Sequence, residues 1–71
     1  MKFVKFYTRT IGDPVYFNPG QVSCVFPSDN YGYTYIVVPG AVDPFEVKGE
    51  LDYVIAKLRS ASEWYAIDYK Q

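Results

Sequence analysis

Few side chains in this sequence could carry out chemistry. Histidine is absent and Cys24 is the single cysteine, so the strongest nucleophile has no imidazole base to activate it. Cys24 lies among apolar residues, where a free cysteine usually packs as a small hydrophobe, and we expect it to be buried. Two carboxylates near the last strand and the helix start could form an acid–base pair or a hard-cation site, but such clusters are usually solvated; the candidates are Asp43, Glu46, Glu50 and Asp52. We therefore expect a protein that is not an enzyme and has no catalytic residues, metal or cofactor.

Aromatic residues, in contrast, are abundant: the 71 residues include eight Tyr, five Phe and one Trp. Tyr31, Tyr33 and Tyr35 alternate along one segment, and alternate residues of a strand point to the same side. Large amphipathic rings with few charges are typical of interface hot spots. We predict that these three residues contact a partner, together with three rings near the C-terminus: Trp64, Tyr65 and Tyr69. The open alternative is that the C-terminal segment or another strand covers the Tyr side within one subunit.

Five short segments rich in β-branched and aromatic residues are separated by Gly, Pro, Asn and Asp, which favour turns. In one such turn we expect the side chain of Asn18 to bond its own backbone. Along the fourth segment, Thr34 and Ile36 should face the core, opposite Tyr33 and Tyr35. The sequence predicts strands at residues 2–8, 15–17, 22–26, 33–38 and 45–47.

The hydrophobic period changes after Gly49. Leu51, Val54, Ile55 and Leu58 recur at the spacing of an amphipathic helix, which we predict over residues 49–61. Residues 62–71 are too aromatic for a disordered tail and should dock, for example as a further strand. The expected fold is a single α+β domain spanning residues 1–71: a bent antiparallel sheet of four or five short strands (1–48), one C-terminal helix (49–61) and an aromatic docking tail (62–71).

Length and charge narrow the function classes. A core of this size rarely supplies more than about 3–5 kcal/mol of net stability, which favours self-association. The formal net charge is −1 and the basic residues are scattered, so we do not expect binding to nucleic acid, which usually needs clustered positive charge. Apolar stretches are far shorter than the ~20 residues of a spanning helix, so no membrane association is expected. With one cysteine and no secretory leader pattern, we expect a cytoplasmic location.

The order of these parts resembles a known family. The motifs lie at residues 15–19 (VYFNP), 21–25 (QVSCV), 34–38 (TYIVV) and 45–48 (FEVK), and together they are similar to the FlbD-type flagellar-operon proteins, also called swarming motility protein D. The resemblance covers about residues 2–58 and implies a strand, a hairpin and a strand leading into a short amphipathic helix. It implies no catalytic residues. The chain differs from that family in the loop at residues 29–32 and in its aromatic tail, and small phage proteins share the same layout.

These observations favour a non-enzymatic protein-binding module, a homodimer or larger, that self-associates through its Tyr-rich strand and C-terminal tail. Two alternatives remain open. The first is a phage-encoded or mobile-element-encoded inhibitor that binds a host protein in the host cytoplasm. The second is a protein that binds a small ligand, such as a nucleotide, between Tyr rings at a subunit interface, with Lys or Arg meeting its anionic group.

Overall fold

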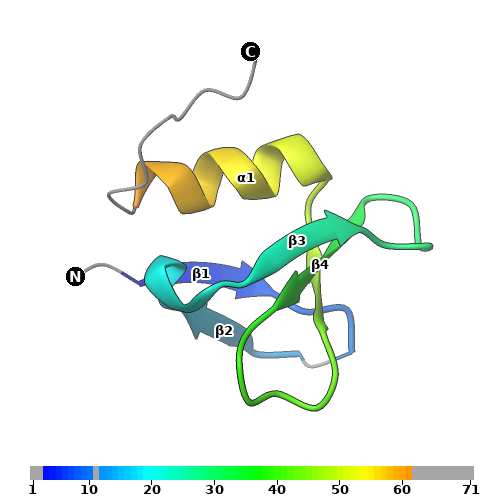
Figure 1. Ribbon diagram of the computed structural model, residues 1–71. Helices are drawn as coiled ribbons and strands as arrows, with labels where there is room; N and C mark the ends of the chain where they lie inside the picture. The colour runs from blue at the N-terminus through cyan, green and yellow to red at the C-terminus, as the bar shows by residue number, and fades with distance from the viewer. Residues whose placement is uncertain (1–2, 11, 62–71) are drawn as a thin grey trace.

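The structure is a computed structural model that describes residues 3–10 and 12–61. These residues form a small α+β fold of two antiparallel sheets and one C-terminal helix, which confirms the predicted class (Figure 1). In chain order the elements are β1 (Val4–Tyr7), β2 (Pro14–Phe17), the 3₁₀ turn η1 (Pro19–Gln21), β3 (Cys24–Pro27), β4 (Tyr33–Val37), β5 (Phe45–Lys48) and α1 (Leu51–Ser60). The predicted tail at residues 62–71 lies outside the described residues.

The strands pair as two antiparallel groups. β1 pairs with β2, while β3, β4 and β5 form a meander with β4 in the middle. An antiparallel bridge between Thr8 and Val47 connects the two groups, and next to it the Arg9 amide donates to the Glu46 carbonyl at 2.9 Å. The hairpin of β1 and β2 therefore continues from the β5 edge, as expected for a strongly bent sheet.

The core forms where one side of each sheet meets α1. In Figure 1 the helix lies across the strands. Its Val54 and Leu58 are fully buried, as are Ile36 of β4 and Val47 of β5. Val4, Phe6 and Phe17 complete the buried apolar cluster from the hairpin side. Alternate residues of β1, β2, β4 and β5 enter this core, and along β4 the opposite side carries Tyr33 and Tyr35, as predicted.

Helix α1 is shorter than predicted because Gly49 and Glu50 serve as its connection to β5. Glu50 is in an extended conformation at the N-cap, and its side chain makes no capping hydrogen bond. Asp52 in the first turn and Lys57 and Arg59 in the last turn carry charges that suit the helix dipole.

The turn after β2 is set by Asn18. Its side-chain Oδ1 accepts a hydrogen bond from the Gly20 amide at 3.0 Å, and its carbonyl accepts one from the Gln21 amide at 2.8 Å. This arrangement confirms the structural role predicted for Asn18 and ends β2 before the chain turns into η1.

Candidate partner-binding face

The outer side of the β3–β4–β5 sheet carries a group of apolar and aromatic side chains. We call this group the aromatic sheet face and define it by Cys24 and Phe26 of β3 and by Tyr33, Tyr35 and Val37 of β4. The strand register places Phe26 opposite Tyr35 and Cys24 opposite Val37. Their neighbours along β4, Thr34 and Ile36, are fully buried on the other side of the sheet.

Two rings form the centre of this face. The Phe26 and Tyr35 ring centroids are 5.2 Å apart and the ring planes are tilted by 43°, within the range of favourable aromatic pairs. Phe26 is 41% exposed, whereas Tyr33, Tyr35 and Val37 are half-buried. Paired rings that expose part of their area to water gain by being covered, because apolar area removed from water stabilises a contact by about 25 cal/mol per Å².

A carboxylate lies beside these rings, and its hydrogen-bonding capacity is largely used. Glu46 of β5 is opposite Tyr35 on the outer side of the sheet, and its side chain is 12% exposed. Its oxygens accept hydrogen bonds from the Ser28 hydroxyl, from Arg9 Nε at 2.8 Å and from Asn30 Nδ2 at 2.6 Å. These bonds lower the pKa of Glu46 from 4.5 to about 2, and the bond from Ser28 has the largest effect. They lower the pKa because they favour the charged form of the carboxyl group.

This network lowers the cost of covering the aromatic sheet face with a partner. An unpaired carboxylate beside the rings would oppose a partner, since removing an isolated charge from water is costly. Here the charge already has a guanidinium and two neutral donors. The network also joins three separate segments, because Arg9 follows β1, Ser28 and Asn30 follow β3, and Glu46 lies in β5. It therefore fixes the loops that border the face.

The predicted contact residues differ in their exposure. Tyr31, in the loop before β4, is 92% exposed. Tyr33 and Tyr35 share the outer side of β4, as predicted, but they are half-buried. Trp64, Tyr65 and Tyr69 lie outside the described residues. Partner binding by these six residues stays a prediction.

Burial of Cys24 was the wrong expectation. Cys24 is a free, exposed cysteine, because β3 begins at this residue and pairs it with the outward-facing Val37. The inward position is taken by Val25, which packs against the core. An apolar sequence neighbourhood indicated burial, but the hairpin register decides which side of the strand the thiol occupies.

Sequence reasoning missed Phe26 as a contact candidate and missed the partners of Glu46. The alternation within β3 could have placed Phe26 on the Tyr side once the pairing with β4 was assumed. No local signal indicates that Arg9, Ser28 and Asn30 meet at one carboxylate. In the described part of the chain, no three Asp, Glu, Cys or His side chains come together in a way that could hold a metal ion.

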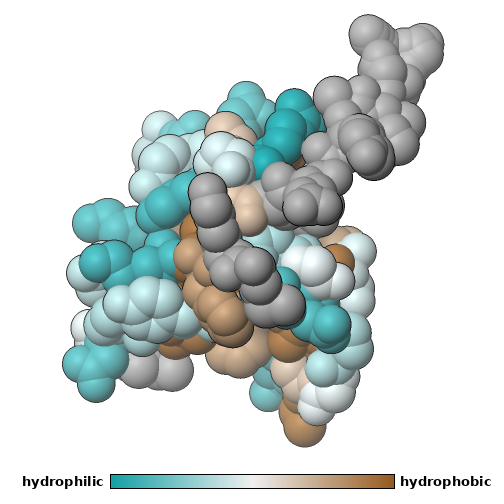
Figure 2. Space-filling model, turned by 90° about the vertical axis from the view of Figure 1, so that its left-hand side faces the viewer, coloured by the Kyte–Doolittle hydropathy of each residue, from teal (hydrophilic) through white to brown (hydrophobic). Residues whose placement is uncertain are grey.

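Hydrophobic surface also occurs at the end of the molecule where β1 starts and α1 ends. Figure 2 shows this side, with hydrophobic side chains in the middle of the view and hydrophilic ones around them. Among the exposed apolar residues, Phe3 is 58% exposed and precedes β1. In the described ranges, no helix is both long and apolar enough to cross a membrane.

Comparison with known proteins gave no match to a family model, a curated protein or a solved structure. The geometry and chemistry of this chain alone therefore support the function proposed for it.

Proposed function

We propose that this protein is a non-enzymatic interaction module that self-associates through its aromatic sheet face. The observation that carries the proposal is the pairing of Phe26 with Tyr35 on the side of the sheet opposite the core, next to a carboxylate that already has its own partners. Tyr31, 92% exposed in the loop before β4, belongs to the same proposal.

A second copy of the chain is the partner that the physics of a small domain favours. The described residues include a core of seven buried apolar side chains, and a core of this size supports only about 3–5 kcal/mol of net stability, so burial of a further apolar face adds to it. In a twofold dimer the same patch on both subunits meets itself. This requires that the centre of the patch carry no uncompensated charge, and the Arg9–Glu46 ion pair next to Tyr35 meets that requirement. Lys48, opposite Tyr33, is exposed on the edge strand β5.

The central strand gives the proposed contact a rigid base. β4 is hydrogen-bonded on both sides, and its inward residues Thr34 and Ile36 are fully buried. Side chains held by such a strand lose little conformational entropy when they are covered, which favours association. The C-terminal residues Trp64, Tyr65 and Tyr69 belong to the same proposal on the strength of the sequence.

Sedimentation equilibrium over about 1–200 μM protein tests the proposal. We expect a concentration-dependent dimer or larger assembly for the natural sequence, because standard interfaces of about 800 Å² per partner support affinities in the micromolar range or tighter. Replacing Phe26 by Ser should weaken the association constant by at least about tenfold, the effect typical of an aromatic hot spot.

Tyr16→Ser is the matched control. Tyr16 is a strand residue that is 58% exposed, but it lies on β2, outside the aromatic sheet face. The Tyr16→Ser variant should associate like the natural sequence. Circular dichroism checks that both variants keep the fold. A strict monomer across the range, or equal association of the two variants, contradicts self-association through this face. A strict monomer would leave a different protein as the remaining kind of partner.

A further inference from the structure

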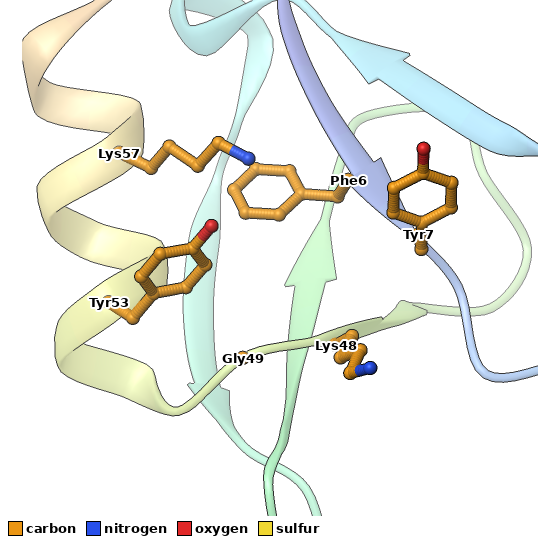
Figure 3. Close-up of a pocket in the computed structure, with 6 residues that line it drawn as sticks. All are labelled: Phe6, Tyr7, Lys48, Gly49, Tyr53 and Lys57. Atoms are coloured by element: carbon orange, nitrogen blue, oxygen red, sulfur yellow. The ribbon is translucent and has the colours of Figure 1, made fainter.

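A separate concave site lies where β1, the end of β5 and the start of α1 meet. Its volume is about 290 Å³, and it is lined by Phe6, Tyr7, Lys48, Gly49, Tyr53 and Lys57 (Figure 3). No residue of the aromatic sheet face belongs to this lining. The pocket therefore needs its own explanation.

The pocket carries positive charge without a matching acid. Lys57 Nζ donates to the Lys5 carbonyl at 2.8 Å and lies 4.8 Å from the centre of the Phe6 ring and 5.5 Å from that of Tyr53. These contacts hold the ammonium in place by a hydrogen bond and by attraction to the ring faces. Among the described residues, no carboxylate lines the pocket and neither Lys48 nor Lys57 forms an ion pair.

A third cation lies close by. Lys5 Nζ is 5.7 Å from the centre of the Tyr7 ring, and Tyr7 is part of the lining. Three of the seven basic residues are thus associated with one hollow in a chain whose net charge is −1. The basic residues are scattered in the sequence, but Lys48 and Lys57 line the same pocket and Lys5 lies beside one of its rings. Such a concentration of one sign of charge attracts an anionic group.

Aromatic rings border the same hollow. Figure 3 shows Tyr53 on the α1 side of Phe6 and Tyr7 on the β1 side. Tyr53 is 54% exposed and Tyr7 is 47% exposed, so both rings have surface available to a planar ligand. Phe6, only 2% exposed, is packed in the core and keeps the hollow apolar at its base.

Gly49 lines the pocket next to the Tyr53 ring. A Cβ at this position would lie 2.6 Å from Tyr53 Cδ2 and 3.1 Å from Tyr53 Cε2. Any residue other than glycine would therefore push the Tyr53 ring from its present place. The absence of a side chain at Gly49 lets the ring border the hollow.

We propose that this pocket binds a free mononucleotide, with the phosphate at Lys48 and Lys57 and the base on the exposed rings of Tyr7 and Tyr53. Lysine ammonium groups form charge-assisted hydrogen bonds to phosphate, and bases stack on Tyr rings in many proteins. The volume of about 290 Å³ is just below the roughly 300–1,000 Å³ that is typical of small-molecule pockets. A single nucleotide suits it better than a strand, because a strand would also need a positive groove beyond the pocket.

Isothermal titration calorimetry of the full chain at low salt tests this proposal, with AMP, UMP, adenosine and inorganic phosphate as probes. We expect AMP or UMP to bind with one site per chain, and adenosine and phosphate each to bind at least about tenfold more weakly, because each makes only one of the two kinds of contact. No binding of either nucleotide up to about 5 mM, a limit that corresponds to roughly 3 kcal/mol, overturns the proposal. Equal binding of AMP and adenosine also overturns it.

Variants locate the site. Lys48→Met should weaken AMP binding by about fivefold, the upper effect of a partly exposed ion pair, and Tyr53→Ala by about tenfold through lost stacking. Arg59→Gln is the control, because Arg59 is on the same helix but is not part of the lining; it should bind AMP like the natural sequence. Equal loss in the Arg59 variant, or no loss in the other two, contradicts the assignment.

A short oligonucleotide tests whether the pocket binds a free nucleotide or a nucleotide within a strand. We expect a single-stranded tetranucleotide to bind no more than about tenfold more tightly than AMP, since each extra stacked base would otherwise tighten binding by about fivefold or more. Much tighter binding would overturn the assignment of a free nucleotide. The Phe26→Ser variant should bind AMP normally, so the pocket and the proposed self-association can fail independently.

Discussion

Replacing Gly49 by Ala should be the most damaging of the single Gly→Ala changes compared here. Gly49 connects β5 to α1 with a φ of 130°, a conformation that residues with a Cβ rarely adopt. The backbone has little freedom to relax. The Gly49 amide donates to the Gly32 carbonyl at 2.8 Å, and its carbonyl accepts from Thr34 Oγ1 at 2.8 Å.

The magnitude follows from two costs. Holding a non-glycine residue in such a backbone region costs about 1–3 kcal/mol. The added Cβ would also lie 2.6 Å from Tyr53 Cδ2 and 3.3 Å from Val54 Cγ2. Val54 is fully buried and cannot yield, whereas Tyr53 is 54% exposed and can turn away at a cost of about 0.5–1.5 kcal/mol. We expect a total loss of about 2–4 kcal/mol, close to the full stability of a domain this small.

Urea unfolding followed by circular dichroism measures this loss, and two other glycines provide controls. Gly40 has a φ of 87°, but a Cβ added there would have nothing within 4 Å, so Gly40→Ala should lose only about 1–2 kcal/mol from the backbone. Gly12 has neither a positive φ nor a close neighbour, and Gly12→Ala should change stability by less than about 1 kcal/mol.

A double variant separates the two costs at Gly49. Adding Tyr53→Ala to Gly49→Ala removes the main clash. Tyr53→Ala should therefore lower the free energy of unfolding less in the Gly49→Ala variant than in the natural sequence. If Gly49→Ala is no more destabilising than Gly40→Ala, or if the two substitutions are additive, the packing argument at Gly49 is refuted.

Three further predictions test the core and the polar network. Leu58→Ala should destabilise the protein by about 2–5 kcal/mol, because a fully buried side chain leaves a cavity; urea unfolding of the variant measures this, and a loss below about 1 kcal/mol would contradict the helix packing. Thr34→Val should cost about 1–3 kcal/mol in the same assay, because the Gly49 carbonyl loses a buried hydrogen bond, whereas Thr34→Ser should retain that bond. The pKa of Glu46 is lowered from 4.5 to about 2, so its contribution is complete above about pH 4.5 and is lost as the pH falls toward 2. The free energy of unfolding of Glu46→Gln should therefore fall less steeply than that of the natural sequence across this pH window, and parallel profiles would contradict the network.

The local elements are predictable because their patterns are local. Alternation of apolar and polar residues identifies the strands, and the spacing of Val54 and Leu58 identifies the buried side of α1. The ends of the elements are predicted less accurately than the elements themselves. The sequence pattern starts the helix at Gly49, but the conformation of this residue makes it the connection from β5.

The features that define the sites depend on long-range pairing. The sequence places Cys24 on the wrong side because only the pairing with Val37 fixes which residues of β3 face outward. The hydrogen bond from Arg9 to Glu46 joins residues 37 positions apart. The pocket likewise combines β1, β5 and α1. Such contacts cannot be predicted from the spacing of residues along the sequence unless the topology is known.

The reaction rate of the Cys24 thiol tests the proposed self-association through the aromatic sheet face most directly. Cys24 is exposed in the subunit and lies on that face opposite Val37. Alkylation with excess iodoacetamide should proceed at the rate of an accessible thiol at about 1 μM protein, and at least about tenfold more slowly at about 200 μM, because association covers the thiol. The slowing should be at least about two- to threefold smaller in Phe26→Ser, whose association is weaker, and should be unchanged in Tyr16→Ser. A rate constant that is independent of protein concentration would contradict the proposed interface.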